Sequence, residues 1–328
     1  MPPDLLTAPT IHRHVPSARA APGLTVIIPT INRARYIADT VRQVLKQSFR
    51  NFELIVVDQS EVAVSSETAT FITALADSRV SYLHLSQPGV ANARNEGICR
   101  SRGEIILFLD DDVTLLTPDF LKAHLSRFTD PTIGAISGRI VERLNLPNAR
   151  HTVARVSLSG RTIDNMFGTE RVFLQGLKGG NMSIRTEIFR TLGGFDRNFD
   201  GTALLEEADF STRMRAAGWK LAFEPKAELL HLSAPAGGNR VASEQEREWW
   251  RFRSTAYYVM KHRGPLGMLP FLATFGVIAT HRALRWRSPR ALFYLFNGIA
   301  AGLSAMQRGA DETLPANIGT ITRNLFDG

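Results

Sequence analysis

The first 110 residues alternate between short apolar runs and longer segments with helical periodicity, and this alternation limits the fold more than any other feature. The apolar runs are short and rich in β-branched residues, as in buried strands, and cover residues 24–29, 52–57, 80–85 and 104–109. Helices are expected between them, at residues 34–47, 66–75 and 89–100. Such an order predicts an α/β fold with a doubly wound, mostly parallel sheet and helices on both faces.

Three consecutive carboxylates, Asp110, Asp111 and Asp112, directly follow the last of these runs. They repel one another, so a strand end that keeps them needs a cation or several hydrogen-bond donors. Ligands of such sheets bind beyond the carboxyl ends of the strands, which favours a metal-bound polyphosphate at this point. The alternative is an acidic turn that caps the next helix.

Two common phosphate-binding fingerprints are absent from the sequence. Residues 29–33 read Pro-Thr-Ile-Asn-Arg where a dinucleotide-binding fold has G-x-G-x-x-G, and no G-x-x-x-x-G-K-[ST] occurs. Phosphate is therefore expected to be held by strand-end carboxylates and a divalent cation. Arg33, Arg35 or Arg94 would offset the remaining charge.

Length and cysteine content set further bounds. With 328 residues and 44% hydrophobic content, the chain is long enough for one large domain and an appendage. A single cysteine, Cys99, excludes an internal disulfide framework and a cysteine-based zinc cluster. Residues 1–22 are rich in Pro, Ala and Arg and contain no apolar run of signal-peptide length, so we expect a flexible tail there.

Positive charge gathers toward the C-terminal end. From residue 236 onward there are twelve Lys or Arg against six Asp or Glu, an excess of six within the net charge of +8. The Arg-rich stretch 281–290 lies between two uncharged apolar runs, 264–280 and 291–307, a pattern typical of a membrane surface rather than of nucleic-acid binding. The runs are short for spanning, and basic connectors prefer the cytoplasm, so we expect peripheral or re-entrant association with the cytoplasmic face. The alternative is a small bundle of ordinary core helices.

Six segments, taken in order, resemble the family 2 glycosyltransferases of the GT-A fold. They are VIIPTINR (26–33), VVDQS (56–60), NARNEG (92–97), FLDDD (108–112), GGNMS (179–183) and EEAD (206–209). The resemblance covers residues 23–235. We therefore expect a GT-A domain over that range, followed by a C-terminal helical, membrane-associating region at residues 236–328.

The resemblance implies a site for a nucleotide and a metal ion. It places Asp58 on the nucleotide base, where a carboxylate accepts from an imide N–H such as that of uracil, and so favours a UDP sugar. Asp110 and Asp112 match the family's D-x-D pair, which implies Mg²⁺ or Mn²⁺, and His231 stands where some relatives have a further metal ligand. Turn capping by Asp58 and a structural role for His231 are the competing interpretations. The implied nucleotide-binding residues are Pro29, Thr30, Asn32, Arg33, Asp58, Arg94, Asp110 and Asp111.

The resemblance also implies a catalytic base and an acceptor loop. Glu207 stands at the base position of the family's E-D-x-D pattern, which is usually Asp, so Glu206 and Asp209 stay alternatives. Acidic residues that complement the dipole at a helix start are the competing explanation. Gly179, Gly180 and Asn181 resemble the acceptor-side loop, where bare backbone can approach a sugar, although an ordinary turn would look the same.

These features lead to a metal-dependent, inverting glycosyltransferase that moves one sugar from a nucleoside-diphosphate donor to a lipid-linked or polysaccharide acceptor in surface glycan biosynthesis. Processive polymerisation is disfavoured, because residues 245–249 have Glu248 where the Q-x-x-R-W motif has Arg. A second hypothesis is a catalytically silent nucleotide-binding or scaffold subunit of a membrane glycan assembly complex. A sugar-nucleotide pyrophosphorylase is a third, but it would have a Gly-rich loop at Pro29-Thr30.

Overall fold

A computed structural model describes residues 22–142, 152–199, 201–238 and 243–314. The tail expected at residues 1–22 lies almost wholly outside these ranges. The strands of the first half are β1 (Leu24–Thr30), β2 (Phe52–Asp58), β3 (Val80–His84), β4 (Ile105–Leu109), β5 (Val113–Leu115) and β6 (Ile133–Glu142). The helices between them are α1 (Ala34–Leu45), α2 (Val62–Leu75), α3 (Val90–Arg100) and α4 (Phe120–Leu125). The alternation expected from the sequence is confirmed, with shifts of a few residues at element ends.

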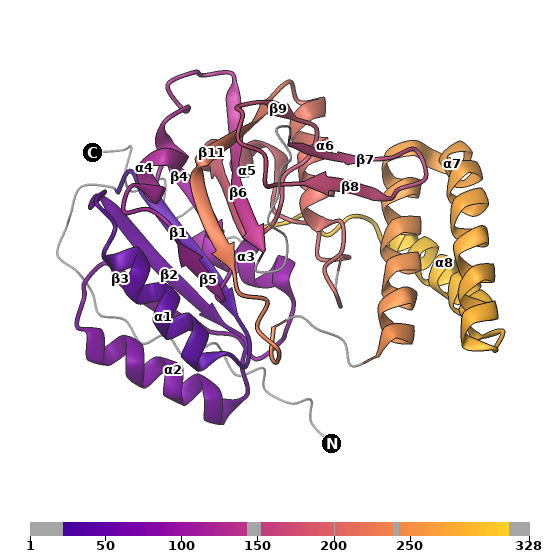
Figure 1. Cartoon of the computed structure of the whole chain (residues 1–328), viewed down its shortest axis with the longest axis horizontal. Coiled ribbons are helices and arrows are strands. Elements are labelled where there is room, and N and C mark those ends of the chain that lie inside the picture. The colour runs from indigo at the N-terminus through magenta and orange to yellow at the C-terminus, as the bar shows by residue number, and fades with distance from the viewer. Residues whose placement is uncertain (1–21, 143–151, 200, 239–242, 315–328) are drawn as a thin grey trace.

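The second half adds four short strands, the long strand β11, two helices of the sheet domain and a long helical region. The strands are β7 (Val153–Val156), β8 (Thr162–Asn165), β9 (Phe173–Leu174), β10 (Asn181–Arg185) and β11 (Lys220–His231). The helices are α5 (Thr186–Leu192), α6 (Glu206–Ala216), α7 (Glu244–Trp286) and α8 (Arg290–Arg308). Figure 1 shows α7 and α8 gathered at one end of the molecule, beside the β7–β8 hairpin.

Nine of the described strands form one central sheet, and its parallel part contains the carboxyl ends predicted to bind ligand. The order is β3-β2-β1-β4-β10-β6-β11-β5, with β9 paired to β11. Neighbours in the β3-β2-β1-β4 segment are parallel, whereas β10 runs antiparallel to both β4 and β6. The predicted α/β fold is therefore confirmed, with antiparallel strands added beyond β4.

The sheet has helices on both faces because its central strands are apolar on both sides. On one face, Ile27, Ile55 and Phe108 pack with residues of α3, α5 and α6. On the other face, Val26 and Leu54 pack with α1, α2 and α4. Continuous burial along β1, β2 and β4 is typical of a parallel sheet, and it fixes the ends of these strands firmly at one edge.

Helix α7 is interrupted at Gly264, whose φ of 65° is not helical and which precedes Pro265. The element is thus two segments, 244–263 and 265–286, and these lie side by side in Figure 1. Phe252 of the first segment contacts Phe275 of the second, and Arg282 near the end binds Glu244 at the start, at 2.9 Å. Gly298 and Gly302 let α8 pack closely on the backbone of the first segment. The three segments share a core with Phe199 and Leu205 of the sheet domain.

Candidate active site

The polar ends of β1, β2 and β4 meet at one edge of the sheet. Thr30 and Asp58 are register partners at the ends of β1 and β2. The Thr30 hydroxyl donates a hydrogen bond of 2.7 Å to Asp111, which follows β4. Three sequence segments predicted to bind nucleotide are therefore adjacent in space, as expected for strand ends of a parallel sheet.

Asp111 is turned inward and is neutralised by the protein itself. Its carboxylate accepts from Arg33 at 2.8 Å, and the same guanidinium lies 3.3 Å from Asp112. Arg33 also donates to the backbone carbonyl of Ala236, which ties the strand end to the segment after β11. Burial raises the pKa of Asp111 to about 6, although Arg33 opposes the shift. Asp111 thus supports the loop, whereas the side chain of Asp110 is partly exposed and that of Asp112 is buried beside His231.

Asp110, Asp112 and His231 bring ligand atoms within 4.8 Å of one another. His231, at the end of β11, places Nε2 3.3 Å from Asp112 Oδ1 and 4.0 Å from Asp110 Oδ2. Asp112 Oδ2 accepts from the backbone N–H of Ala234, while its buried Oδ1 has no hydrogen bond to any described residue. Burial alone would raise the pKa of Asp112, but His231 and Ala234 lower it below its ordinary value. Two carboxylates and an imidazole are a donor set that fits Mn²⁺ or Mg²⁺.

The glycine loop before β10 packs directly against this acidic cluster. Gly180 has a φ of +71°, and a Cβ there would overlap the carboxylate of Asp110. Its carbonyl also accepts from the backbone N–H of Asp110, at 3.1 Å. A Cβ on Gly179 would lie 2.9 Å from the Arg94 guanidinium and 3.5 Å from the Glu207 carboxylate. The bare backbone of the loop therefore lies among Asp110, Arg94 and Glu207.

The side chain of Asn181, at the start of β10, fixes the glycine loop to β6, β11 and α4. Its side-chain amide donates to the carbonyls of Arg139 and Ala227, and its oxygen lies 2.8 Å from Nε2 of His124. His124 is fully buried, with Nδ1 3.0 Å from the Ser183 hydroxyl, and burial lowers its pKa to about 4. Sequence reasoning did not find His124, because a lone histidine on a short helix shows no pattern that separates it from a surface residue.

The acids at the start of α6 have three different surroundings. Glu206 is buried and forms an ion pair with Arg94, whose guanidinium also lies over the Phe195 ring. Burial raises the pKa of Glu206 to about 8, although Arg94 opposes the shift. Glu207 is partly exposed beside Gly179. Burial alone would lower the pKa of nearby Lys178. The negative charges of Glu207 and Asp164 outweigh this effect, so the pKa is raised.

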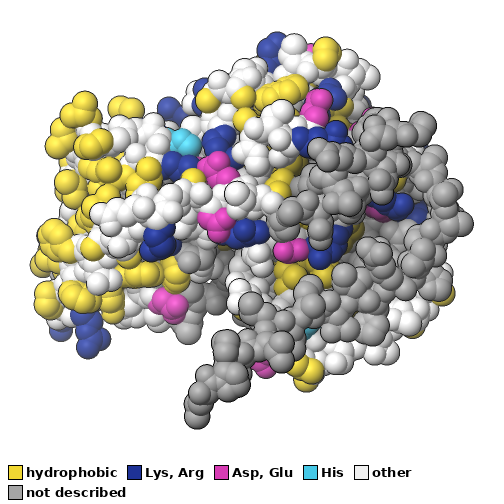
Figure 2. Space-filling view, turned by 180° about the vertical axis from the view of Figure 1, so that it is seen from behind, with side chains coloured by type: hydrophobic (Ala, Val, Ile, Leu, Met, Phe, Trp, Pro, Cys, Tyr) yellow, Lys and Arg dark blue, Asp and Glu magenta, His cyan; other side chains and the backbone are white. Residues whose placement is uncertain are grey.

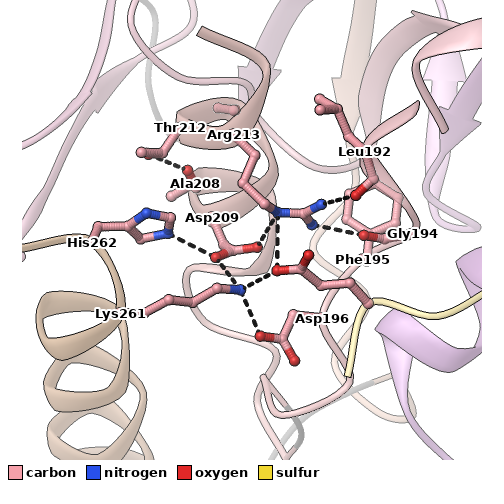
Figure 3. Close-up of polar contacts among 12 residues, drawn as sticks. Leu192, Gly194, Phe195, Asp196, Ala208, Asp209, Thr212, Arg213, Lys261 and His262 are labelled. Carbon is pink, nitrogen blue, oxygen red and sulfur yellow. Dashed lines mark hydrogen bonds and ion pairs between the residues drawn. The ribbon is translucent and has the colours of Figure 1, made fainter. Parts of the chain in front are cut away.

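Asp209 belongs to a buried ionic cluster centred on Lys261 (Figure 3). Lys261 Nζ lies 2.7 Å from both Asp196 and Asp209 and 2.6 Å from Glu312. Arg213 and His262 also contact Asp209. Burial alone would raise the pKa of Asp209, but these partners lower it to about 2. The three carboxylates are close enough to hold a metal ion, but the Lys261 ammonium already lies among them, so the cluster joins α6 to α7.

Asp58 is buried and has two partners at the end of β2. One carboxylate oxygen accepts from the backbone N–H of Ser60 at 2.8 Å and the other from the Tyr82 hydroxyl at 3.1 Å. Each carboxylate oxygen can accept more than one hydrogen bond, so acceptor capacity remains. Asn32, with a φ of 55°, accepts from the backbone N–H of Glu61, and Pro29 lies partly buried in β1. The β1–α1 and β2–α2 loops are thereby fixed to each other.

The model of the glycosyl transferase family 2 matches residues 25–193, so the chain belongs to this family. Among curated proteins, protein y4gI of Sinorhizobium fredii is 28% identical over 278 residues, which are 78% of this chain and 29% of that protein. The pre-mycofactocin glycosyltransferase of Mycobacterium tuberculosis is 30% identical over 231 residues, which are 69% of this chain and 46% of that enzyme. The chain thus spans less than half the length of either relative.

Solved structures confirm the GT-A-type fold. The mannosyltransferase PcManGT from Pyrobaculum calidifontis, in complex with GDP-Man and Mn²⁺, superposes with a TM-score of 0.54 at 21% identity, covering 93% of this chain and 84% of that one. Residues 1–349 of S. aureus TarS in complex with UDP-GlcNAc superpose with a TM-score of 0.59 at 15% identity, covering 91% and 83%.

Proposed function

We propose that the chain transfers a single sugar, with inversion, from a nucleoside-diphosphate sugar to an acceptor hydroxyl. The observation that supports this most directly is the convergence of three elements at one sheet edge. The acids Asp110 and Asp112 follow β4, the glycine loop precedes β10, and Glu207 lies in the first turn of α6. A donor diphosphate beside the acids and an acceptor on the glycine loop would both lie within reach of Glu207.

Asp110, Asp112 and His231 would hold a divalent cation, Mn²⁺ or Mg²⁺, which when bound neutralises charge on the diphosphate. Asp58 would accept from the base, which favours UDP, with Pro29, Thr30, Asn32 and Arg33 forming the surrounding wall. Arg33 adds positive charge next to the metal ligands. The Mn²⁺ of PcManGT and the UDP-GlcNAc of TarS are compatible with this arrangement.

Among the three candidate acids, Glu207 is the one available as a base. Glu206 forms an ion pair with Arg94, and Asp209 forms ion pairs with Lys261 and Arg213, so neither carboxylate is free to accept a proton from the acceptor. The Glu207 carboxylate would take the proton of the acceptor hydroxyl while that oxygen bonds to the anomeric carbon. The bond from that carbon to the diphosphate breaks, and the nucleoside diphosphate leaves with the electron pair. Asn181 acts as a positioning residue, because its amide is engaged with backbone carbonyls below the loop.

The helical region supports a membrane-bound location. α7 is the one helix in the described ranges that is long and apolar enough to cross a membrane, yet Gly264 divides it. Its second segment is apolar on both sides, with Phe271 and Phe275 buried and Leu266 and Leu269 exposed by 80% and 66%. Figure 2 shows hydrophobic side chains gathered over this end of the molecule. We propose that this face lies in a membrane surface, on the cytoplasmic side, where basic residues such as Arg285 and Arg290 meet anionic lipid.

A donor panel with Mn²⁺ tests the proposed activity. Nucleoside diphosphate release from UDP and GDP sugars is measured for the unmodified chain, Glu207→Gln and Glu67→Gln. Glu67 is exposed on α2, so its variant makes the same chemical change away from the site. We expect Glu207→Gln to lose at least about a hundredfold in turnover, the usual effect of removing a general base. Nucleotide binding without any turnover by the unmodified chain would instead identify a silent binding subunit.

A further inference from the structure

A cavity of about 660 Å³ lies between the sheet domain and the helical region. Its walls come from the turn of the β7–β8 hairpin, the segment just before α6, and both segments of α7. The hairpin is held firmly, since Arg263 of α7 donates to the carbonyls of Ser157 and Leu158 in the turn. Gly160 has a φ of +87°, and a Cβ there would overlap the side chain of Thr255 on α7. The cavity is therefore part of the folded structure rather than a gap between loose loops.

The charged residues of the cavity lining are basic. Arg161 projects from the hairpin, Arg251 from the first segment of α7 and Arg282 from the second, and no described lining residue is acidic. Behind the wall, Glu248 lies 3.2 Å from Arg251 and 3.5 Å from Arg282, and Arg282 also binds Glu244. These acids hold the two α7 guanidinium groups in place. Arg161 is exposed, and its positive charge adds to the wall from the opposite side.

The rest of the lining is apolar. Leu205 and Phe275 form the buried floor, while Val277, 71% exposed, stands at the rim. Val277 continues the exposed apolar stripe of the second α7 segment, with Leu269 two turns before it and Leu284 two turns after it. Two of the three guanidinium groups are thus balanced by acids behind the wall, and Arg161 supplies the excess positive charge. A cavity with guanidinium donors that opens onto an exposed apolar helix face is complementary to an amphiphile with an anionic head and a long hydrocarbon chain.

Two walls of this cavity are connected through the chain to residues of the candidate active site. Leu205, in the floor, is two residues from Glu207, so their Cα atoms are at most about 7.6 Å apart. On the other wall, Thr162 begins β8, and Asp164 of the same strand binds Lys178 at 3.3 Å, next to Gly179. Neither Glu207 nor Gly179 lines the cavity, but a short stretch of chain leads from its wall to Glu207, and the Asp164–Lys178 ion pair leads from its wall to the glycine loop.

We propose that this cavity binds the phosphate or diphosphate headgroup of a long-chain lipid acceptor. The guanidinium groups of Arg161, Arg251 and Arg282 bind the headgroup oxygens, and the hydrocarbon chain leaves over Val277 along the apolar face of α7. The inference rests on the proposed transferase activity and narrows its acceptor to a sugar carried on a lipid phosphate or diphosphate. The headgroup phosphate is bound in the cavity, and a hydroxyl of the attached sugar is the group that reacts. A free phosphate ion, or any anionic phospholipid, offers the same headgroup charge, so the test separates these sources.

The test measures binding of the full chain to phosphatidylcholine vesicles that contain a long-chain polyprenyl phosphate. Parallel vesicles contain the uncharged polyprenol or the same fraction of phosphatidylglycerol, and inorganic phosphate is added as a competitor. Arg161→Glu reverses a charge inside the cavity, and Arg251→Gln removes a second one. Arg290→Glu makes the same reversal at the exposed start of α8, outside the cavity.

We expect Arg161→Glu to weaken binding to polyprenyl phosphate vesicles about tenfold relative to Arg290→Glu, because a charge-assisted contact becomes a repulsion. Arg251→Gln should lower binding in the same direction, and neither cavity variant should affect polyprenol vesicles. Equal losses for Arg161→Glu and Arg290→Glu, or equal preference for phosphatidylglycerol, would overturn the inference in favour of general surface charge. Full displacement by inorganic phosphate would also overturn it.

A parallel assay of donor hydrolysis by the unmodified chain distinguishes a failure of the lipid-phosphate inference from a failure of the proposed transferase activity. If the chain hydrolyses no donor, the proposed transferase function fails whatever the vesicles show. If it hydrolyses a donor with Mn²⁺ while the cavity variants bind polyprenyl phosphate normally, only the lipid-phosphate inference fails.

Discussion

Acid should weaken the fold by charging His124. The ring is fully buried on α4, and its Nε2 must donate, because the Asn181 oxygen 2.8 Å away can only accept. In the neutral ring, Nδ1 is then an acceptor for the Ser183 hydroxyl. Burial lowers the pKa of His124 to about 4, whereas an unfolded histidine titrates near 6.5. Between these two values the unfolded chain binds more protons than the folded protein.

The sign of the effect follows from this difference. The stabilising contribution is complete above a pH of about 6.5 and is lost as the pH falls toward about 4, because protons then favour the unfolded chain. A shift of roughly 2.5 pKa units corresponds to about 3 kcal/mol of unfolding free energy across that window. Because His124 supports Asn181 below the glycine loop, the same acid range should also loosen the candidate acceptor site.

Urea unfolding of the unmodified chain and of His124→Gln, followed across this pH range, measures the contribution. Glutamine can still donate to Asn181 but does not titrate, so the variant keeps the contact and removes only the proton binding. The difference in unfolding free energy between the two chains should shrink by about 3 kcal/mol as the pH falls from 6.5 to 4. Parallel pH profiles would refute the reasoning, since other titrating groups affect both chains equally.

Three further outcomes follow from the site geometry. Gly180→Ala should weaken Mn²⁺ binding by about tenfold, because the added Cβ displaces the Asp110 carboxylate. Gly218→Ala is the matched control, since Gly218 has a φ of +90° and open space around it. Equal Mn²⁺ titration curves for the two variants would contradict the account. Lys261→Met should cost about 3–5 kcal/mol in urea unfolding, because three carboxylates lose their shared cation, whereas exposed Lys226→Met should change little. A chelator should abolish donor turnover and excess Mn²⁺ should restore it; turnover unaffected by the chelator would exclude a metal at Asp110 and Asp112.

Local patterns were sufficient to predict the parallel half of the sheet but not the rest. The runs that became β1, β2 and β4 are continuous and apolar, and their alternation with helices predicted a parallel sheet, although not that β4 would pair with β1. The insertion of β10, antiparallel, between β4 and β6 could not be predicted, because it joins segments more than 40 residues apart in the sequence. Pairing of that kind is decided by packing of the whole domain rather than by local preference.

The candidate site was likewise predicted only in part from the sequence. The consecutive acids that include Asp110 and Asp112 suggested metal ligands, and the family resemblance added His231. The fold brings the three together, although their role stays a prediction. The partners that occupy Glu206 and Asp209 were not visible in the sequence. Arg94 and Lys261 lie 112 and 52 residues from the acids that they bind, and a charged residue alone does not show which partner it will meet.

The break at Gly264 shows a similar limit in the helical region. The apolar run at residues 264–280 was expected from the sequence, but neither the break at Gly264 nor the return of the second segment onto the first was predicted. That return places Arg251 and Arg282 on one cavity wall. The membrane-surface pattern of charge and apolar runs says nothing about such a cavity, because its walls also include the distant β7–β8 hairpin.

The central claim is that Asp110, Asp112 and His231 form a divalent-metal site that holds the donor diphosphate. Calorimetric titration of UDP into the Mn²⁺-loaded protein tests it most directly, with the unmodified chain, Asp112→Asn and Glu207→Gln compared. The account predicts metal-dependent UDP binding that Asp112→Asn abolishes and Glu207→Gln retains. Undiminished, Mn²⁺-dependent UDP binding by Asp112→Asn would contradict it.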